Sequence, residues 1–166
     1  MLIITHVRSE TDAEAIRALI PAFFNWIRAR YPDHAVNIDA YVKTQDIDGQ
    51  MRDLLMRFAP PTADCLLARL DGVPVGMVMT KPHSPGTCEM NRMFVTDAAR
   101  GQGVGKALVA EIMATAKDLG YTRMVLSAAP LHTAALGLYR KAGFTPDPSL
   151  PDTGAGDVEV RMALDL

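Results

Sequence analysis

The feature that most constrains this chain is a glycine-rich loop between a β-rich segment and an amphipathic helical segment. The loop reads Arg100-Gly101-Gln102-Gly103-Val104-Gly105-Lys106. Glycines let the backbone turn tightly and bring its N–H groups toward an anion. The helix that follows adds its positive N-terminal end and several unsatisfied N–H donors. The loop therefore predicts a phosphate or pyrophosphate site, and a plain glycine-rich helix entry is the alternative interpretation.

Two common nucleotide-binding motifs do not fit this loop. A nucleoside-triphosphate loop needs Ser or Thr after its Gly-Lys pair, but Ala107 stands there and offers no hydroxyl to magnesium. A dinucleotide fold needs Gly-x-Gly-x-x-Gly, and its last position here is Lys106 or Leu108. The next β-rich segment, residues 123–127, also ends without an acidic residue to hold a ribose. A nucleotide-binding protein is therefore a weak third interpretation of the chain.

Hydrophobic periodicity predicts strands alternating with helices. We expect strands over residues 2–8, 64–70, 73–80, 87–95, 122–128 and 158–164. We expect one helix that ends at residues 30–33, an apolar helical stripe over residues 47–58, and helices over residues 104–119 and 133–142. This order predicts an α/β (mixed α+β) fold, with one mixed sheet and helices on both faces, in a single domain of residues 1–166.

Local signals refine these boundaries. Thr11 to Glu14 has the pattern of a capping box, which would start the first helix. Asp71-Gly72 between two apolar runs predicts a tight hairpin, because Gly tolerates positive φ. Residues 82–86 and the polar stretch 145–157 are predicted to be loops.

Composition excludes several classes of protein. The net charge of −2 shows no basic clustering of the kind that nucleic-acid binders carry. No apolar run approaches the roughly 18 residues of a membrane span, and the first residues lack a signal-peptide pattern. We therefore expect a cytoplasmic protein that binds neither nucleic acid nor a membrane. Cys65 and Cys88 are expected to be buried free thiols, and the four histidines lack zinc-site spacing, so no metal is expected.

Two motifs resemble the GNAT superfamily of N-acetyltransferases. The superfamily's main motif, Arg/Gln-x-x-Gly-x-Gly/Ala after a strand ending in Val, stands here as Met93-Phe94-Val95 followed by Arg100, Gly103 and Gly105. The second stands as Ala135-Leu136-Gly137-Leu138-Tyr139-Arg140-Lys141-Ala142-Gly143-Phe144. The motifs match in order and spacing over roughly residues 64–144. The resemblance implies a mostly antiparallel mixed sheet of about six or seven strands, with a splay between its two central strands.

The same resemblance implies a binding mode for acetyl-CoA as co-substrate, without a metal. The backbone of Met93, Phe94 and Val95 would pair with the pantetheine arm like an added strand. His132 stands where many members have an Asn that contacts this arm, although a helix-capping or surface His is equally consistent with the sequence. The pyrophosphate would be held by the loop, whose members are Arg100, Gly101, Gln102, Gly103, Val104, Gly105 and Lys106.

The resemblance also implies the chemistry, a direct transfer of acetyl to a primary amine. Tyr139 stands at the position of the family's acid, and a core aromatic is the alternative for it. Glu89 is a candidate base, because strand alternation would place it on one face with Asn91 and Met93. A partnered or solvated carboxylate is the alternative for Glu89. Other members carry a Glu on the next strand, where this chain has Ser127.

The sequence leaves the acceptor and the assembly open. A small-molecule or peptide amine is expected between the first two helices and the final loop. Aspartates near the second helix could attract a cationic amine or form a solvated acidic face; they are Asp33, Asp39, Asp46, Asp48 and Asp53. An acetyl-CoA-binding sensor without turnover is the alternative function, and the resemblance also allows a homodimer.

Overall fold

One mixed sheet of seven strands organises the chain. The computed structural model describes residues 1–130, 132–151 and 159–166. The strand order is β1-β2-β3-β4-β5-β7-β6. The strands are β1 (Leu2–His6), β2 (Asp64–Leu70), β3 (Val73–Ser84), β4 (Thr87–Val95), β5 (Arg123–Ala128), β6 (Thr145–Pro146) and β7 (Val160–Asp165). Among the described strands only β4 and β5 run parallel, which confirms the mostly antiparallel mixed sheet.

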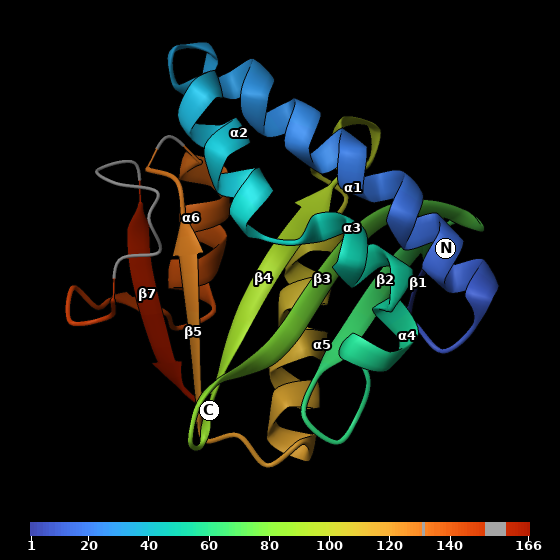
Figure 1. Cartoon of the computed structure of the whole chain (residues 1–166). Helices are drawn as coiled ribbons and strands as arrows, with labels where there is room; N and C mark the ends of the chain where they lie inside the picture. The colour runs from blue at the N-terminus through green and yellow to red at the C-terminus, as the bar shows by residue number, and fades with distance from the viewer. Residues whose placement is uncertain (131, 152–158) are drawn as a thin grey trace.

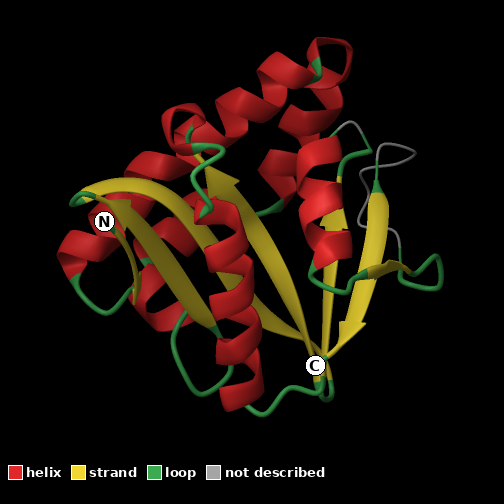
Figure 2. Cartoon of the chain, turned by 180° about the vertical axis from the view of Figure 1, so that it is seen from behind, coloured by secondary structure: helices red, strands yellow, loops and turns green. Residues whose placement is uncertain are grey.

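Helices cover both faces of this sheet, as the sequence predicts. One face carries α1 (Glu10–Arg30), α2 (Ala35–Thr44), α3 (Ile47–Arg52) and α4 (Leu54–Arg57), and the other carries α5 (Val104–Asp118) and α6 (Thr133–Lys141). Figures 1 and 2 show the two helical layers from opposite sides. The described residues also form two short 3₁₀ segments, Pro32–His34 and Asp97–Ala99.

The two layers enclose separate apolar cores. Strand β2 is buried on both faces, because Leu66 packs with α5 and α6 while Leu67 packs with α1. The α5 side also buries Leu108 and Ile112, whose helical spacing the sequence shows. Such double burial removes nearly the whole apolar surface of a central strand from water, at about 25 cal/mol per Å². The sheet is therefore the shared wall of both cores.

The start of α1 differs from the prediction. The helix begins at Glu10, and its N-cap is Ser9, whose hydroxyl accepts a hydrogen bond from the Asp12 N–H at 3.2 Å. The predicted capping box at Thr11–Glu14 is wrong, because Ser9 supplies a cap two residues earlier and Thr11 already lies in the first turn.

The region after α1 also differs from the prediction of a single helix over residues 47–58. The apolar stripe is buried, with Met51, Leu54 and Phe58 in the core, but the helix breaks at Asp53 into α3 and α4. The preceding α2 was not predicted. It has no buried residue, so its sequence lacks the strong apolar stripe that marks a helix.

Turns and strand ends agree in part with the predictions from the sequence. Asp71 and Gly72 both have positive φ, 50° and 84°, which confirms the tight hairpin between β2 and β3. The loop predicted over residues 82–86 is shorter, because β3 continues to Ser84. The short β6 lies inside the predicted loop 145–157, whose residues 152–157 are outside the described part of the chain, as is residue 158. The alternation of β7 is confirmed, since Val160, Met162 and Leu164 all pack with the α5–α6 core.

The two central strands separate soon after they meet. β4 pairs with β5 only through Thr87–Glu89 and residues 123–125. β5 pairs with β7 along its whole length and β4 pairs with β3 along its length, so beyond this short contact the two strands diverge, each with its own outer partner (Figure 1). Residues 90–95 of β4 therefore have no β5 partner, which confirms the predicted splay.

Other predictions concern thiols, membranes and metals. Cys65 and Cys88 are both buried and free, as expected, and they pack in different cores. Within the described ranges, no helix is both long and apolar enough to cross a bilayer. The described side chains include no cluster of three metal-ligating groups.

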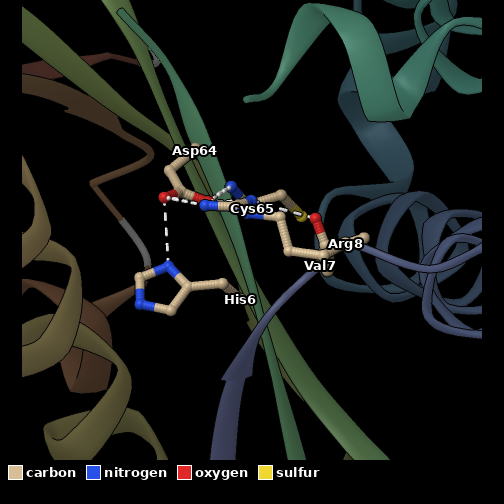
Figure 3. A network of polar contacts seen from close by, with 5 residues as sticks. All are labelled: His6, Val7, Arg8, Asp64 and Cys65. Carbon is tan, nitrogen blue, oxygen red and sulfur yellow. Dashed lines mark hydrogen bonds and ion pairs between the residues drawn. The ribbon is translucent and has the colours of Figure 1, made fainter. Parts of the chain in front are cut away.

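A buried carboxylate joins the first two strands of the sheet. Asp64 is 2% exposed and accepts two hydrogen bonds from the Arg8 guanidinium, at 2.8 and 2.7 Å. Its oxygens also lie 2.8 Å from the Cys65 N–H, which donates to one of them, and 3.0 Å from His6 Nδ1 (Figure 3). The hydrogen bonds to Asp64 raise the pKa of Arg8. This network fixes the start of β2 against the end of β1.

Removing this carboxylate should destabilise the fold. Asp64→Ala leaves Arg8 and a buried N–H without their acceptor, and we expect unfolding free energy to fall by about 1–3 kcal/mol. Chemical denaturation followed by circular dichroism measures the change. Asp71→Asn is the control, because it removes only an exposed ion pair with the N-terminus, and Asn tolerates the positive φ of this turn position. Equal stability of the Asp64→Ala variant and the control variant would contradict the assignment.

Candidate active site

A cleft of about 580 Å³ occupies the splay between β4 and β5. Its walls come from α1, α2, β4, the glycine-rich loop, the end of β5 and the start of α6. Nearly all of the residues selected from the sequence line it; they are Glu89, Met93, Phe94, Val95, Arg100, Gly101, Gly103, Val104, Gly105, Lys106, His132 and Tyr139. Gln102 does not line the cleft, and its side chain instead donates to the Ala98 carbonyl at 3.0 Å.

A bulge in β4 shapes the middle of the cleft. Met77 pairs with Phe94 and Met79 pairs with Asn91, so β4 holds one residue more than β3 between these pairs. At this point Arg92 adopts a left-handed conformation with φ of 50°. A bulge bends its strand and re-aims side chains, and such bulges are frequent near active sites.

The bulge reverses which side chains face which core. Met90 packs with α5, whereas Phe94, an even number of residues later, packs with α1. Met93 lies against the α5 core instead. The prediction that Glu89 and Met93 share one face is therefore wrong, because regular alternation does not pass through a bulge. We call the side of the cleft next to α5 and α6 the cofactor side, because the predicted cofactor-binding residues lie there, and the opposite side, next to α1 and α2, the helix side.

The glycine-rich loop closes the cofactor side. Gly101 and Gly103 have φ of 75° and 80°, which strain any residue with a Cβ. Gly103 is also the N-cap of α5, so the first N–H groups of that helix, which have no acceptor within the helix, lie at the loop. A Cβ at Gly105 would lie 3.0 Å from Met93 Cε, so the helix packs closely on β4. These features fit the anion site that the sequence predicts, next to the free edge of β4.

Arg100 connects the loop to the opposite wall. Its Nε donates to the Val95 carbonyl at 3.2 Å, and its guanidinium pairs with Asp97 at 2.8 Å. The guanidinium carbon also lies 4.3 Å from the centre of the Trp26 ring, a cation–π contact. The side chain therefore spans from the loop to α1.

His132 lies at the start of α6 and packs on aromatic residues of the helix side. Its ring centre is 4.7 Å from that of Trp26 and 5.0 Å from that of Tyr31. Burial and the charges of Arg30 and Arg100 lower the pKa of His132 to about 4. The imidazole is therefore neutral at pH 7 and carries one N–H. Nε2 has no hydrogen-bond partner among the described residues, so the ring keeps a polar atom for a bound group.

Tyr139 lies in α6, 6% exposed, with its ring edge-on to Phe144 at 6.1 Å. It belongs to the α5–α6 core and also lines the cleft, so both sequence interpretations describe part of its environment. Burial raises the pKa of Tyr139 above the ordinary value for tyrosine. Its hydroxyl is therefore protonated at neutral pH and can act as a hydrogen-bond donor.

Glu89 lines the cleft and forms an ion pair with Lys81 on β3, at 3.7 Å. Its charge also contributes to a raised pKa at Tyr41 in α2, for which burial is the largest cause. This coupling places Glu89 near the helix side of the cleft. Ser127, at the end of β5, also lines the cleft.

Several cleft residues were not selected from the sequence. Trp26, Tyr31, Tyr41 and Glu159 line the cleft from segments without any motif. Arg92 interrupts an otherwise alternating strand, and that interruption is the one signal that could have identified it. The aspartates noted near the second helix are absent from the lining, and Asp39, Asp46 and Asp53 pair with arginines instead.

Comparison with known proteins identifies the family. Residues 20–144 match the acetyltransferase (GNAT) family. An uncharacterized N-acetyltransferase of Schizosaccharomyces pombe is 36% identical over 102 residues, covering 60% of this chain and 63% of the relative. The human N-acetylaspartate synthetase is 30% identical over 131 residues, covering 78% of this chain and 42% of the relative. The chain therefore spans less than two thirds of the length of these relatives.

A solved structure agrees with the fold. The PaiA N-acetyltransferase from Thermoplasma acidophilum, crystallised in complex with coenzyme A, superposes with a TM-score of 0.78. It is 16% identical, and the match covers 100% of this chain and 99% of that one. The chain belongs to the GNAT family of acetyltransferases, which are acyl-transferring enzymes.

The loop glycines provide a test of where a cofactor binds. Gly103→Val places a branched side chain at positive φ and beside the outward-facing amides, so it should abolish acetyl-CoA binding measured by calorimetry. Gly120→Val is the matched control, because Gly120 has φ of 88° but lies at the far end of α5. Both variants carry similar backbone strain, and only the first should lose binding. Undiminished affinity in a folded Gly103→Val variant would place the cofactor elsewhere.

Proposed function

We propose that this chain transfers the acetyl group of acetyl-CoA directly to a primary amine. The observation that carries the proposal is the splay, which gives one cleft both a free strand edge and an anion-binding loop. An extended cofactor with a pyrophosphate at one end matches this pair of features. The coenzyme A complex of the Thermoplasma acidophilum structure supports the choice of cofactor.

The cofactor would lie on the α5–α6 side of the cleft. Residues 91–95 have main-chain groups without a β5 partner, and the pantetheine amides would bind there as an added strand. The pyrophosphate would rest on the amides of residues 101–106, at the N-terminus of α5. The acetyl group would then reach the bulge, between the cofactor side and the helix side.

The bulge suits the chemical step. An extra strand residue is left outside the regular ladder, so an N–H near Met93 is available to polarise the thioester carbonyl. In other acyl-transfer sites one such donor contributes about 2.7–4 kcal/mol to transition-state stabilisation. The amine attacks the carbonyl carbon from the helix side, the C–S bond breaks, and coenzyme A leaves as a thiolate.

Tyr139 would stabilise the departing sulfur. Its raised pKa makes complete proton transfer to a thiolate unfavourable, because a thiol has an ordinary pKa of about 8.5. A hydrogen bond from the hydroxyl still stabilises the negative charge as the C–S bond breaks. Tyr139 therefore acts as a hydrogen-bond donor to the sulfur and keeps its proton, and the released thiolate takes its proton from solvent.

Replacing Tyr139 by Phe tests this role. The ring packing is kept and only the hydroxyl is lost, so turnover should fall on the order of 10²-fold with cofactor affinity nearly unchanged. Steady-state thiol release and calorimetry measure the two quantities. Tyr121→Phe is the control, since its hydroxyl donates to the Thr62 carbonyl at 2.6 Å outside the cleft. Wild-type turnover in Tyr139→Phe would leave Tyr139 with a packing role only.

The incoming amine must lose a proton, and Glu89 is our candidate base, directly or through water. A lysine-like amine has a pKa of about 10.4, so it arrives mainly as ammonium at neutral pH. The helix-side position of Glu89 suits contact with that amine. Its ion pair with Lys81 at 3.7 Å is long enough for an ammonium to compete for the carboxylate.

Glu89→Gln separates a base from a cation anchor. A base predicts lower turnover, with a deficit that shrinks as pH rises, because more amine then arrives neutral. An anchor predicts a higher acceptor KM with turnover largely kept. A pH series of steady-state kinetics distinguishes the two. Unchanged kcat and KM across the series would make Glu89 a structural carboxylate.

The overall proposal is tested by thiol release from acetyl-CoA with a panel of amino acids, polyamines, aminoglycosides and peptides. An acetylated amine, confirmed by mass spectrometry, is the expected result. Tight acetyl-CoA binding without turnover on any amine would instead favour an acetyl-CoA sensor.

A further inference from the structure

Arg92 is a buried cation on the helix side of the cleft. It is 8% exposed, yet it lines the cleft. Its guanidinium NH1 donates to Gln50 Oε1 on α3 at 2.6 Å and lies 4.0 Å from Met79 Sδ. These contacts show that the side chain extends from β4 toward the α1–α3 layer, away from the cofactor loop.

Among the described residues, this guanidinium has no carboxylate partner. Within residues 1–130, 132–151 and 159–166, no Asp or Glu forms an ion pair with Arg92, and its Nε and NH2 groups have no hydrogen-bond acceptor. Glu89 is close enough for its charge to favour the charged form of Arg92, but Glu89 pairs with Lys81. Buried charges are normally paired, because removing an ion from water is costly.

The backbone at Arg92 is strained as well. A non-glycine residue at φ of 50° costs roughly 1–2 kcal/mol, and such strain gathers at binding sites. The bulge therefore holds a long cationic side chain in a position that a regular strand would not provide.

A neutral acceptor group lies next to this cation in the sequence. Asn91 lines the cleft, and its buried side-chain oxygen has no hydrogen-bond partner among the described residues. A guanidinium supplies N–H donors in the planar arrangement that a carboxylate accepts, and an amide oxygen accepts an N–H of an amine. The two neighbours thus offer complementary groups for the two ends of one small molecule.

We propose that Arg92 binds a carboxylate of the acceptor, so that the substrates are amines that also carry a free carboxylate, namely amino acids. This inference rests on the proposed acetyl transfer and adds its substrate class. The carboxylate accepts from Nε and NH2 of Arg92, and the amine lies beside Asn91 and Glu89. The apolar side chains of Phe23, Ile27 and Ile38 also line the cleft and would contact the rest of the molecule.

The first experiment compares matched acceptors on the unmodified protein. L-Leucine, L-phenylalanine and L-aspartate are each measured against the corresponding α-amide by thiol release from acetyl-CoA. A charge-assisted hydrogen-bond pair predicts kcat/KM for the acids roughly 10- to 100-fold above the amides. Equal values for acids and amides, or higher values for amides, would overturn the inference.

The second experiment uses Arg92→Gln, with Arg52→Gln as the matched control on the exposed face of α3. Arg92→Gln should reduce the acid-to-amide ratio toward one, mainly through acceptor KM, while acetyl-CoA affinity is kept. Arg52→Gln should keep the wild-type ratio. A wild-type ratio in folded Arg92→Gln would show that Arg92 only supports Gln50.

A third measurement does not depend on folding of the variant. Isocaproate and 3-phenylpropionate, which lack an amine, should inhibit the wild-type protein competitively against the acceptor, and the matching amides should not. Inhibition by neither compound would contradict the inference. Turnover on simple amines without preference for acids would overturn only the inferred substrate class. The absence of turnover on any amine would overturn both the substrate class and the proposed acetyl transfer.

Discussion

The short pairing between β4 and β5 is the constraint on which the rest of the molecule depends. Three residues of each strand pair in parallel, and beyond them β5 stays paired only with β7 and β4 only with β3. Parallel neighbours in a continuous sheet would satisfy all of their main-chain groups, and no cleft would form. Here β4 is held by its pairing with β3, and β5 by its pairing with β7. The sheet can therefore stay open between β4 and β5 while both apolar cores remain packed.

The bulge at Arg92 gives the cleft two different sides. It turns Met93 toward α5 while Arg92 extends toward α3, so adjacent residues of one strand serve opposite sides of the cleft. The backbone strain is local, and the packing of β4 against β3 on either side of the bulge maintains it. One strand therefore presents a free backbone edge to one side of the cleft and the charged side chain of Arg92 to the other.

Much of the fold and of the cofactor side could be predicted from the sequence, because glycine conformation, strand alternation and helical periodicity are local properties. The loop at Gly101–Lys106 and the hairpin at Asp71 are examples. The helix side could not be predicted in the same way. The relation between Glu89 and Met93 depends on one extra strand residue, and the positions of Trp26 and Tyr41 depend on how α1 and α2 pack, which no local pattern records.

The register shift in β4 also constrains which changes in its sequence this strand can accept. Because the bulge inverts the inward and outward pattern downstream, loss of one residue there would restore a regular ladder and exchange the environments of every side chain up to Val95. Substitutions alter one contact at a time, whereas a change in length alters both walls of the cleft together. Strand β4 is therefore a segment whose length is more strictly determined than its composition.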